Sequence, residues 1–180
     1  MSELFPNQSF GMKTFKHSRL PIIVTSEFDF FRCIVFENNF YGKTVSELHR
    51  GNLRSSNADN RYSKLFPYNK ISYWADSPAT ARAEIKYHNN SNNLLTFWAY
   101  DDATSTFPTL PNDEPLYIID GLQFDFYEIL EKFEQGYKLS KYEQEIIDDI
   151  IYENPDCLAY ESRRKTKGVN YLFFEKGFNK

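Results

Sequence analysis

The chain has 180 residues, of which 41% are hydrophobic, and it carries a formal net charge of −4. This length favours a single domain, which removes roughly two-thirds of its unfolded surface from water on folding. The acidic balance argues against nucleic acid as the main partner, and no apolar run approaches the roughly 18 residues of a membrane span. We therefore expect a soluble, cytoplasmic protein that binds neither nucleic acid nor a membrane.

The N-terminal part predicts an irregular leader followed by a strand. Residues 1–20 are polar and irregular, so the folded domain is expected to span residues 21–180. Residues 28–38 are rich in aromatic and β-branched side chains, which is typical of a strand. Arg32 stands in the middle of this run.

The next segments carry a helix-capping signal and a second strand. Residues 44–50 predict a short helix in which Thr44 and Glu47 form a capping box. Residues 51–60 predict a loop. Residues 70–75 have the alternating, aromatic-rich composition of a strand.

A helix over residues 78–88 has clear boundaries in the sequence. Ser77 is a natural N-cap, and Pro78 suits the first helical position. The asparagine-rich residues 89–93 favour turn conformations, so the helix should end before them.

The second half of the chain predicts further strands and two amphipathic helices. Strands are expected at residues 94–100, 115–120, 157–162 and 169–175, and helices at residues 124–136 and 139–154. The second helix should have one apolar face, formed by Tyr142, Ile146, Ile147, Ile150 and Ile151. Because strands lie at both ends with helices between them, we expect a mixed α+β domain with a mainly antiparallel sheet flanked by helices.

Two charged residues stand where burial would make them informative. Arg32 interrupts an apolar strand, so it either meets an anion, pairs with a structural carboxylate or lies on an exposed face. Glu84 shares a helix face with Ala81 and His88, bordered by Ile85. This placement predicts either a carboxylate on an inward-facing wall or a boundary residue that contacts His88.

Three further residues gain interest from their neighbours. Tyr73 lies on the strand that leads into the Glu84 helix, so the two side chains can form two walls of one cleft, although Tyr73 could equally fill the core. Arg61 lies in a loop and alone would be a solvated charge. Ser162 precedes a basic turn, at residues 163–168, which could hold an anion or form a polar hairpin.

The sequence contains no motif typical of a metal site or of a reactive cysteine. Cys33 and Cys157 lie far apart in apolar segments, and the histidines show no metal-ligand spacing. We therefore expect buried, reduced thiols, no metal site and no cysteine nucleophile. The common phosphate-binding, zinc-protease and hydrolase motifs are also absent.

Taken in order, these segments resemble the RES domain, a family named for its Arg, Glu and Ser. The matching segments are FFRCIVF around Arg32, NRYS around Arg61, YWADSPATARAE from Tyr73 to Glu84, and LAYESRRKTKGVNYLFF around Ser162. The central segment is the most specific of the four. An LHRG segment at Arg50 is a rival for the first family arginine.

The resemblance implies a fold similar to ADP-ribosyltransferase toxins and an enzyme that cleaves the nicotinamide–ribose bond of NAD. Under it, Glu84 binds the ribose hydroxyls or stabilises the positive charge that develops on the ribose, Tyr73 stacks beside the nicotinamide, and Ser162 hydrogen-bonds the substrate. Arg32 and Arg61 are then the candidates for the pyrophosphate. NAD is the substrate, and no metal is implied.

The resemblance also implies a toxin of a bacterial toxin–antitoxin pair, with an antitoxin protein as partner. The ADP-ribose acceptor stays open between inorganic phosphate, water and a protein side chain, the last making the chain an ADP-ribosyltransferase. Arg163 and Arg164 are candidates for binding a phosphate acceptor. Because the loop at Arg61 departs from the family pattern, a catalytically silent nucleotide- or partner-binding module is the alternative, and a purely structural interaction protein is a third.

Overall fold

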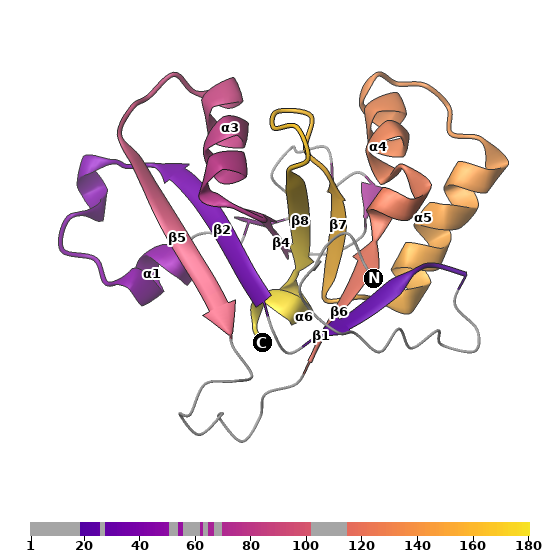
Figure 1. Ribbon diagram of the computed structural model, residues 1–180, viewed down its shortest axis with the longest axis horizontal. Coiled ribbons are helices and arrows are strands. Elements are labelled where there is room, and N and C mark those ends of the chain that lie inside the picture. Colours follow the sequence, from indigo (N-terminus) through magenta and orange to yellow (C-terminus); the bar gives the residue numbers. More distant parts are fainter. Residues whose placement is uncertain are drawn as a thin grey trace.

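The structure is a computed structural model that describes residues 19–25, 28–50, 54–55, 62, 65–66, 70–101 and 115–180. These residues form one α+β domain built on a mixed sheet (Figure 1). The expected leader, up to residue 18, lies outside the described residues. No helix in the described ranges is long and apolar enough to cross a bilayer.

The sheet joins eight strands in the order β1-β6-β7-β8-β4-β2-β5, with β3 paired to β4. Among the described strands, β6 and β7 pair in parallel and the other pairs are antiparallel, which confirms the expected mixed, mainly antiparallel sheet. The strands are β1 (Ile22–Thr25), β2 (Phe28–Val35), β3 (Arg54–Ser55), β4 (Lys70–Ala75), β5 (Leu94–Asp101), β6 (Leu116–Asp120), β7 (Cys157–Glu161) and β8 (Val169–Phe174). The helices are α1 (Val45–Arg50), α3 (Pro78–His88), α4 (Phe126–Glu134), α5 (Lys141–Glu153) and α6 (Glu175–Phe178), with 3-10 turns η1 (Asn38–Phe40) and η2 (Gly121–Phe124).

Local capping chemistry sets the helix starts as the sequence predicts. The Ser77 hydroxyl accepts the Thr80 backbone N–H at 3.1 Å, with Pro78 at the start of α3. The Glu47 carboxylate accepts the Thr44 backbone N–H at 2.7 Å, and the Thr44 hydroxyl accepts that of Glu47 at 3.2 Å. The capping box before α1 is therefore confirmed.

Three details of the predicted elements were wrong. The loop expected at residues 51–60 contains β3. Strand β2 pairs with β4 only at Ala75, so the start of β4, at Lys70 and Ile71, is open for pairing with this short strand. Tyr142 is 67% exposed, since the buried stripe of α5 begins one turn later, at Ile146. β1 was not expected as a strand, although its apolar residues pair with β6.

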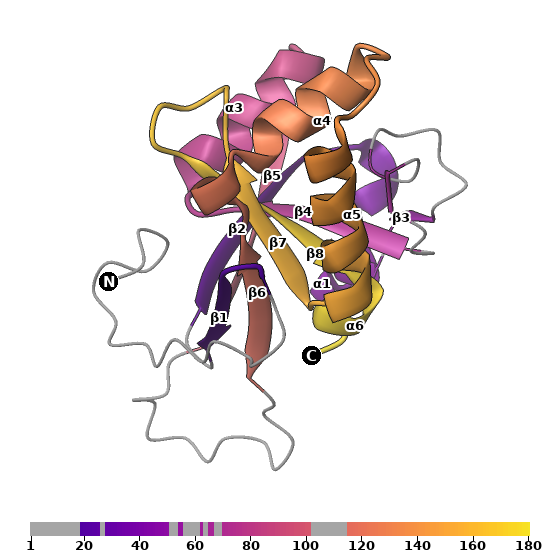
Figure 2. The same ribbon diagram turned by 90° about the vertical axis from the view of Figure 1, so that its right-hand side faces the viewer.

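Two apolar layers pack on opposite faces of the central strands. Alternate residues of β7 and β8, such as Leu158 and Leu172, join the cluster beneath α4 and α5. Their neighbours, such as Ala159 and Tyr171, join the cluster on the other face. Figure 2 shows α5 lying along this part of the sheet.

The β2–β5 ribbon diverges from the rest of the sheet. β2 pairs with β5 along its whole length, yet with β4 at a single position, Phe31 opposite Ala75. Phe30 turns across the sheet face, with its ring 4.7 Å from Tyr171 and 5.0 Å from Phe173 between centroids. The sheet therefore opens between β2 and β4. Helix α3, which connects β4 to β5, lies beside this opening.

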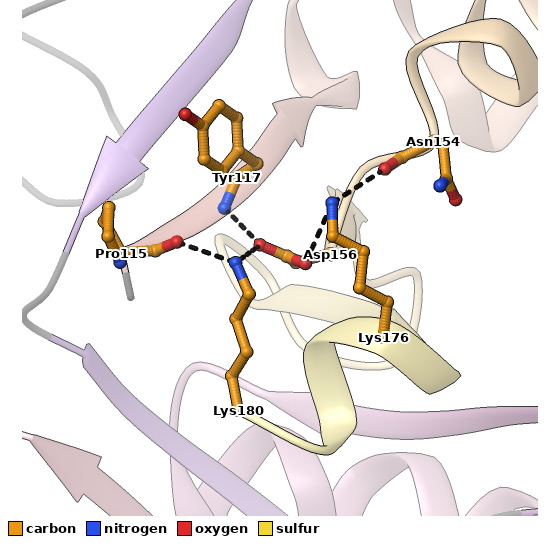
Figure 3. Close-up of polar contacts among 6 residues, drawn as sticks. All are labelled: Pro115, Tyr117, Asn154, Asp156, Lys176 and Lys180. Carbon is orange, nitrogen blue, oxygen red and sulfur yellow. Dashed lines mark hydrogen bonds and ion pairs between the residues drawn. The ribbon is translucent and has the colours of Figure 1, made fainter. Parts of the chain in front are cut away.

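The C-terminal helix closes over a buried carboxylate (Figure 3). Asp156 is fully buried, and its carboxylate accepts the Tyr117 N–H at 2.9 Å and pairs with Lys180 at 2.7 Å and Lys176 at 3.6 Å. Gly177 packs so closely that a Cβ there would lie 2.3 Å from the Asp156 backbone oxygen. These contacts fix α6 against the junction of β6 and β7.

Candidate functional site

A cleft of about 410 Å³ opens where β2 diverges from β4. Its size falls within the range of small-molecule sites. Arg32, Tyr73 and Glu84, three residues predicted from the sequence, line the cleft together. Strand β2, strand β4 and helix α3 each contribute one of them.

Glu84 projects into the cleft from the middle of α3. Its face was predicted correctly, because Ala81, Ile85 and His88 line the same cleft. One carboxylate oxygen, Oε1, accepts two hydrogen bonds, from the Ser162 hydroxyl at 2.6 Å and from the Asn170 side-chain amide at 2.7 Å. Within the described part of the chain, no hydrogen bond reaches the other oxygen, Oε2.

Ser162 holds Glu84 from the end of β7. The serine is buried, and its hydroxyl oxygen accepts the backbone N–H groups of Arg164 and Lys165, each at 3.2 Å. A hydroxyl has one hydrogen, and here it is donated to Glu84. For Ser162 to bind a substrate directly, as the family resemblance implies, this hydrogen would have to leave Glu84.

Arg32 is 6% exposed, which excludes the interpretation that it lies on an open strand face. Its guanidinium turns toward β4, where Nη1 donates to the Ser72 hydroxyl at 3.1 Å and to the Tyr73 carbonyl at 2.9 Å. These contacts hold a positive charge against the strand that carries Tyr73. Arg50, its rival in the sequence, ends α1, and its side chain lies outside what the structure describes.

Aromatic rings form much of the remaining wall. The Tyr62 ring lies 5.0 Å from Tyr73 and 6.1 Å from Tyr160, and the hydroxyls of Tyr62 and Tyr160 are hydrogen-bonded at 2.5 Å. All three tyrosines line the cleft. Arg61, predicted to bind the pyrophosphate, lies outside the described residues, although its neighbour Tyr62 reaches this wall.

Sequence reasoning missed Tyr62, Tyr160 and Asn170 as members of the site. The chain has thirteen tyrosines, so nothing in the sequence distinguishes these two from tyrosines that fill the core. Asn170 did give a signal, because it is a polar residue inside the apolar strand VNYLFF. Every residue of that strand is buried, so its amide required a partner.

The basic turn between β7 and β8 rises between α3 and α4 (Figure 1). The Arg163 guanidinium lies 4.6 Å from the centre of the Tyr127 ring, and that of Arg164 lies 3.2 Å from the Tyr87 ring. Both are cation–π contacts, which tie the turn to each helix. Binding of a phosphate acceptor by these arginines stays a prediction.

The cysteines are buried free thiols, as predicted. Cys33 lines the cleft. Burial raises the pKa of the Cys157 thiol well above its ordinary value, with a smaller contribution from Asp156, so this thiol is held in its unreactive form. Among the described residues, no three metal-ligating side chains gather into a group that could hold an ion.

Comparison of the chain with protein-family models, curated proteins and solved structures found no match.

Proposed function

We propose that this chain is a RES-domain enzyme with an ADP-ribosyltransferase-like fold that cleaves the nicotinamide–ribose bond of NAD. The observation that carries the proposal is the arrangement of Glu84, whose Oε1 is held by Ser162 and Asn170 in a cleft that Arg32 and Tyr73 also line. One carboxylate oxygen is fixed in place. The other is left for a ligand.

The chemistry needs little more than a fixed negative charge. Nicotinamide leaves NAD with the bonding electron pair and becomes neutral, so no general acid is required, and positive charge develops on the ribose as in glycoside cleavage. Oε2 of Glu84 would stabilise this charge or bind the ribose hydroxyls. A well-placed group of this kind lowers a barrier by about 3–4 kcal/mol.

The other walls of the cleft would each bind a different part of NAD. The positive charge of Arg32 suits the pyrophosphate, a role that Arg61 would share. Tyr73 offers a ring on which nicotinamide can stack, and Tyr62 extends the aromatic surface beside it at 5.0 Å. Ser162 then contributes by holding Glu84.

The same proposal covers the biological setting. The ADP-ribosyl group, released from nicotinamide, would form its new bond to inorganic phosphate or water, with a protein side chain as the third acceptor. The protein would act as a cytoplasmic toxin, consistent with two unpaired buried cysteines. A neutralising antitoxin would block the cleft.

Nicotinamide release from NAD tests the proposal. Purified protein is incubated with NAD, with and without phosphate, and the products are separated by chromatography. We expect free nicotinamide together with ADP-ribose 1″-phosphate, ADP-ribose or modified protein, according to the acceptor. Glu84→Gln should lower the rate about 100- to 1,000-fold.

The matched control is Glu161→Gln, which removes an exposed carboxylate next to Ser162 and should leave the rate unchanged. Folded wild-type protein that binds NAD without releasing nicotinamide would instead identify a silent binding module. Equal rates for wild type and Glu84→Gln would remove Glu84 from the mechanism.

A further inference from the structure

We infer that Asn170 is a positioning residue that orients the Glu84 carboxylate for reaction, an inference that rests on the proposed function. Asn170 is the second residue of β8 and lines the cleft. Its side-chain Nδ2 donates to Oε1 of Glu84 at 2.7 Å.

The surroundings of Asn170 make this hydrogen bond a built feature. The residue is 6% exposed, and it sits between Ala75 of β4 and Tyr160 of β7 in the sheet register. A buried amide without a hydrogen bond is destabilising. An apolar residue would therefore stabilise this strand more, unless the amide has a specific partner. The partner it finds is the carboxylate at the centre of the cleft.

Two donors from separate strands converge on the same oxygen. Ser162 approaches Oε1 from the end of β7 at 2.6 Å, and Asn170 approaches it from β8. A glutamate side chain has several rotatable bonds, and one hydrogen bond leaves the carboxylate free to swing about the bonded oxygen. A second donor restricts that motion and so fixes the direction in which Oε2 points.

Docking of α3 does not depend on this contact alone. Near the start of the helix, Gly168 packs on Thr80 so closely that a Cβ would lie 2.7 Å from the threonine hydroxyl. Near its end, the Arg164 guanidinium lies over the Tyr87 ring. Since the helix is held on both sides of Glu84, the Asn170 amide is available for orienting the carboxylate.

Loss of the amide should therefore affect the chemical step more than substrate binding. Small misplacement of a group that acts on the transition state costs up to about 100-fold in rate, whereas contacts made equally by bound substrate appear in KM. For Asn170→Leu, which keeps the shape and removes the donor, we expect kcat to fall about 10- to 100-fold. KM for NAD should stay within about 3-fold.

Steady-state kinetics of nicotinamide release, with NAD affinity measured by calorimetry, test this inference. Tyr87→Ala is the control, because it removes a contact that docks α3 but lies outside the cleft lining. It should lower the melting temperature and leave kcat unchanged. If Asn170→Leu does not fold, Asn170→Ser provides the same comparison. The serine side chain is one bond shorter than that of asparagine, so its hydroxyl does not reach Glu84 as the amide does.

The outcomes separate this inference from the function beneath it. A fall in kcat with KM preserved, and unchanged kcat in Tyr87→Ala, supports the positioning role. Wild-type kcat in Asn170→Leu, or a loss confined to NAD affinity, overturns that role while the enzyme stays active. Wild-type protein that releases no nicotinamide overturns the proposed function, and the positioning role with it.

Discussion

Two groups of buried polar side chains stand out among the described residues. One group, Arg32, Ser162 and Asn170, surrounds the cleft, and its contacts end on Glu84 or on β4. The other centres on Asp156, at the opposite end of β7 from Ser162. A buried charge must find partners, so each group constrains the backbone that supplies them.

Replacing Asp156 should destabilise the fold without touching the cleft. Asp156→Asn keeps the shape of the side chain but loses the charge that Lys180 and Lys176 meet at 2.7 and 3.6 Å. We expect the free energy of unfolding to fall by about 2 kcal/mol, because both ion pairs are lost. The loss is no larger because both lysines can turn to water once the charge is gone. Urea unfolding followed by circular dichroism measures it.

Lys176→Met serves as the comparison for Asp156→Asn. Its side chain is half exposed and its ammonium makes the longer of the two ion pairs, so its loss should cost under about 1 kcal/mol. Unfolding curves of Asp156→Asn that superimpose on wild type would show that the buried carboxylate contributes nothing to α6 docking.

At the scale of single elements, α5 is fixed at its start by a charged cap. The Ser140 hydroxyl and the Glu143 carboxylate form a capping box, and Lys132 of α4 donates to the same carboxylate at 2.5 Å. The Lys132 hydrogen bond, and then those from Ser140, lower the pKa of Glu143 to about 2. The two helices are thus joined through one ionised group.

This depressed pKa makes the α4–α5 contact sensitive to acid. A carboxylate with a lowered pKa in the folded state stabilises the fold above its unfolded value, near 4.5, and the gain disappears as pH falls toward about 2. Wild type should therefore melt higher than Glu143→Gln at pH 7. The difference should shrink below about pH 4.5, as thermal melts across this range would show.

A Lys132→Met background tests whether the ion pair causes that effect. Without the lysine, only the Ser140 hydrogen bonds remain on Glu143, so the pH dependence of the difference should weaken. A wild-type advantage that stays constant from pH 7 to pH 2.5 would contradict the assignment.

Elements with local signals were predictable, and the two short strands that depend on a neighbouring strand edge, β1 and β3, were not. Ser77 and Pro78 fix the start of α3 through contacts within four residues, so the sequence shows them directly. β1 and β3 are short, four and two residues, and exist because a neighbouring strand edge is available. No pattern within such short segments reports which edge is open.

The site divides in the same way. Tyr73 and Glu84 are eleven positions apart in one strand–turn–helix segment, so their convergence on one cleft follows from local geometry. Asn170 and Tyr160 reach it only because β8 pairs with β4 and β7 pairs with β8. That strand order is a property of the whole chain, which a motif read along the sequence cannot contain.

At the scale of the whole molecule, the cleft draws its lining from segments that lie far apart along the described chain. Its lining comes from β2, β4, α3, α4, β7 and β8, whose residues range from Phe31 to Asn170. The single pairing position between β2 and β4 allows the opening, and the turn between β7 and β8 contacts both α3 and α4. A ligand in the cleft must therefore hold together segments that are distant in sequence.

Binding of NAD should consequently stabilise the domain as one cooperative unit. Glu84→Gln is the form to use, since it slows turnover about 100- to 1,000-fold while keeping a hydrogen-bonding side chain. At NAD one hundred times above its dissociation constant, the gain is about 2.7 kcal/mol, or roughly 5–10 °C in melting temperature for a chain of this size. Differential scanning calorimetry with and without NAD measures the shift, with free nicotinamide as the ligand control.

The shape of that transition carries as much information as its position. If the β2–β5 ribbon, joined to β4 at one position, unfolded separately, NAD would move one of two transitions and leave the other in place. Because Phe30 packs on Tyr171 and Phe173 across the sheet, we expect a single transition that moves as a whole. Two transitions would mean that the cleft joins two independently stable halves, and an unshifted single transition would mean that NAD does not occupy it.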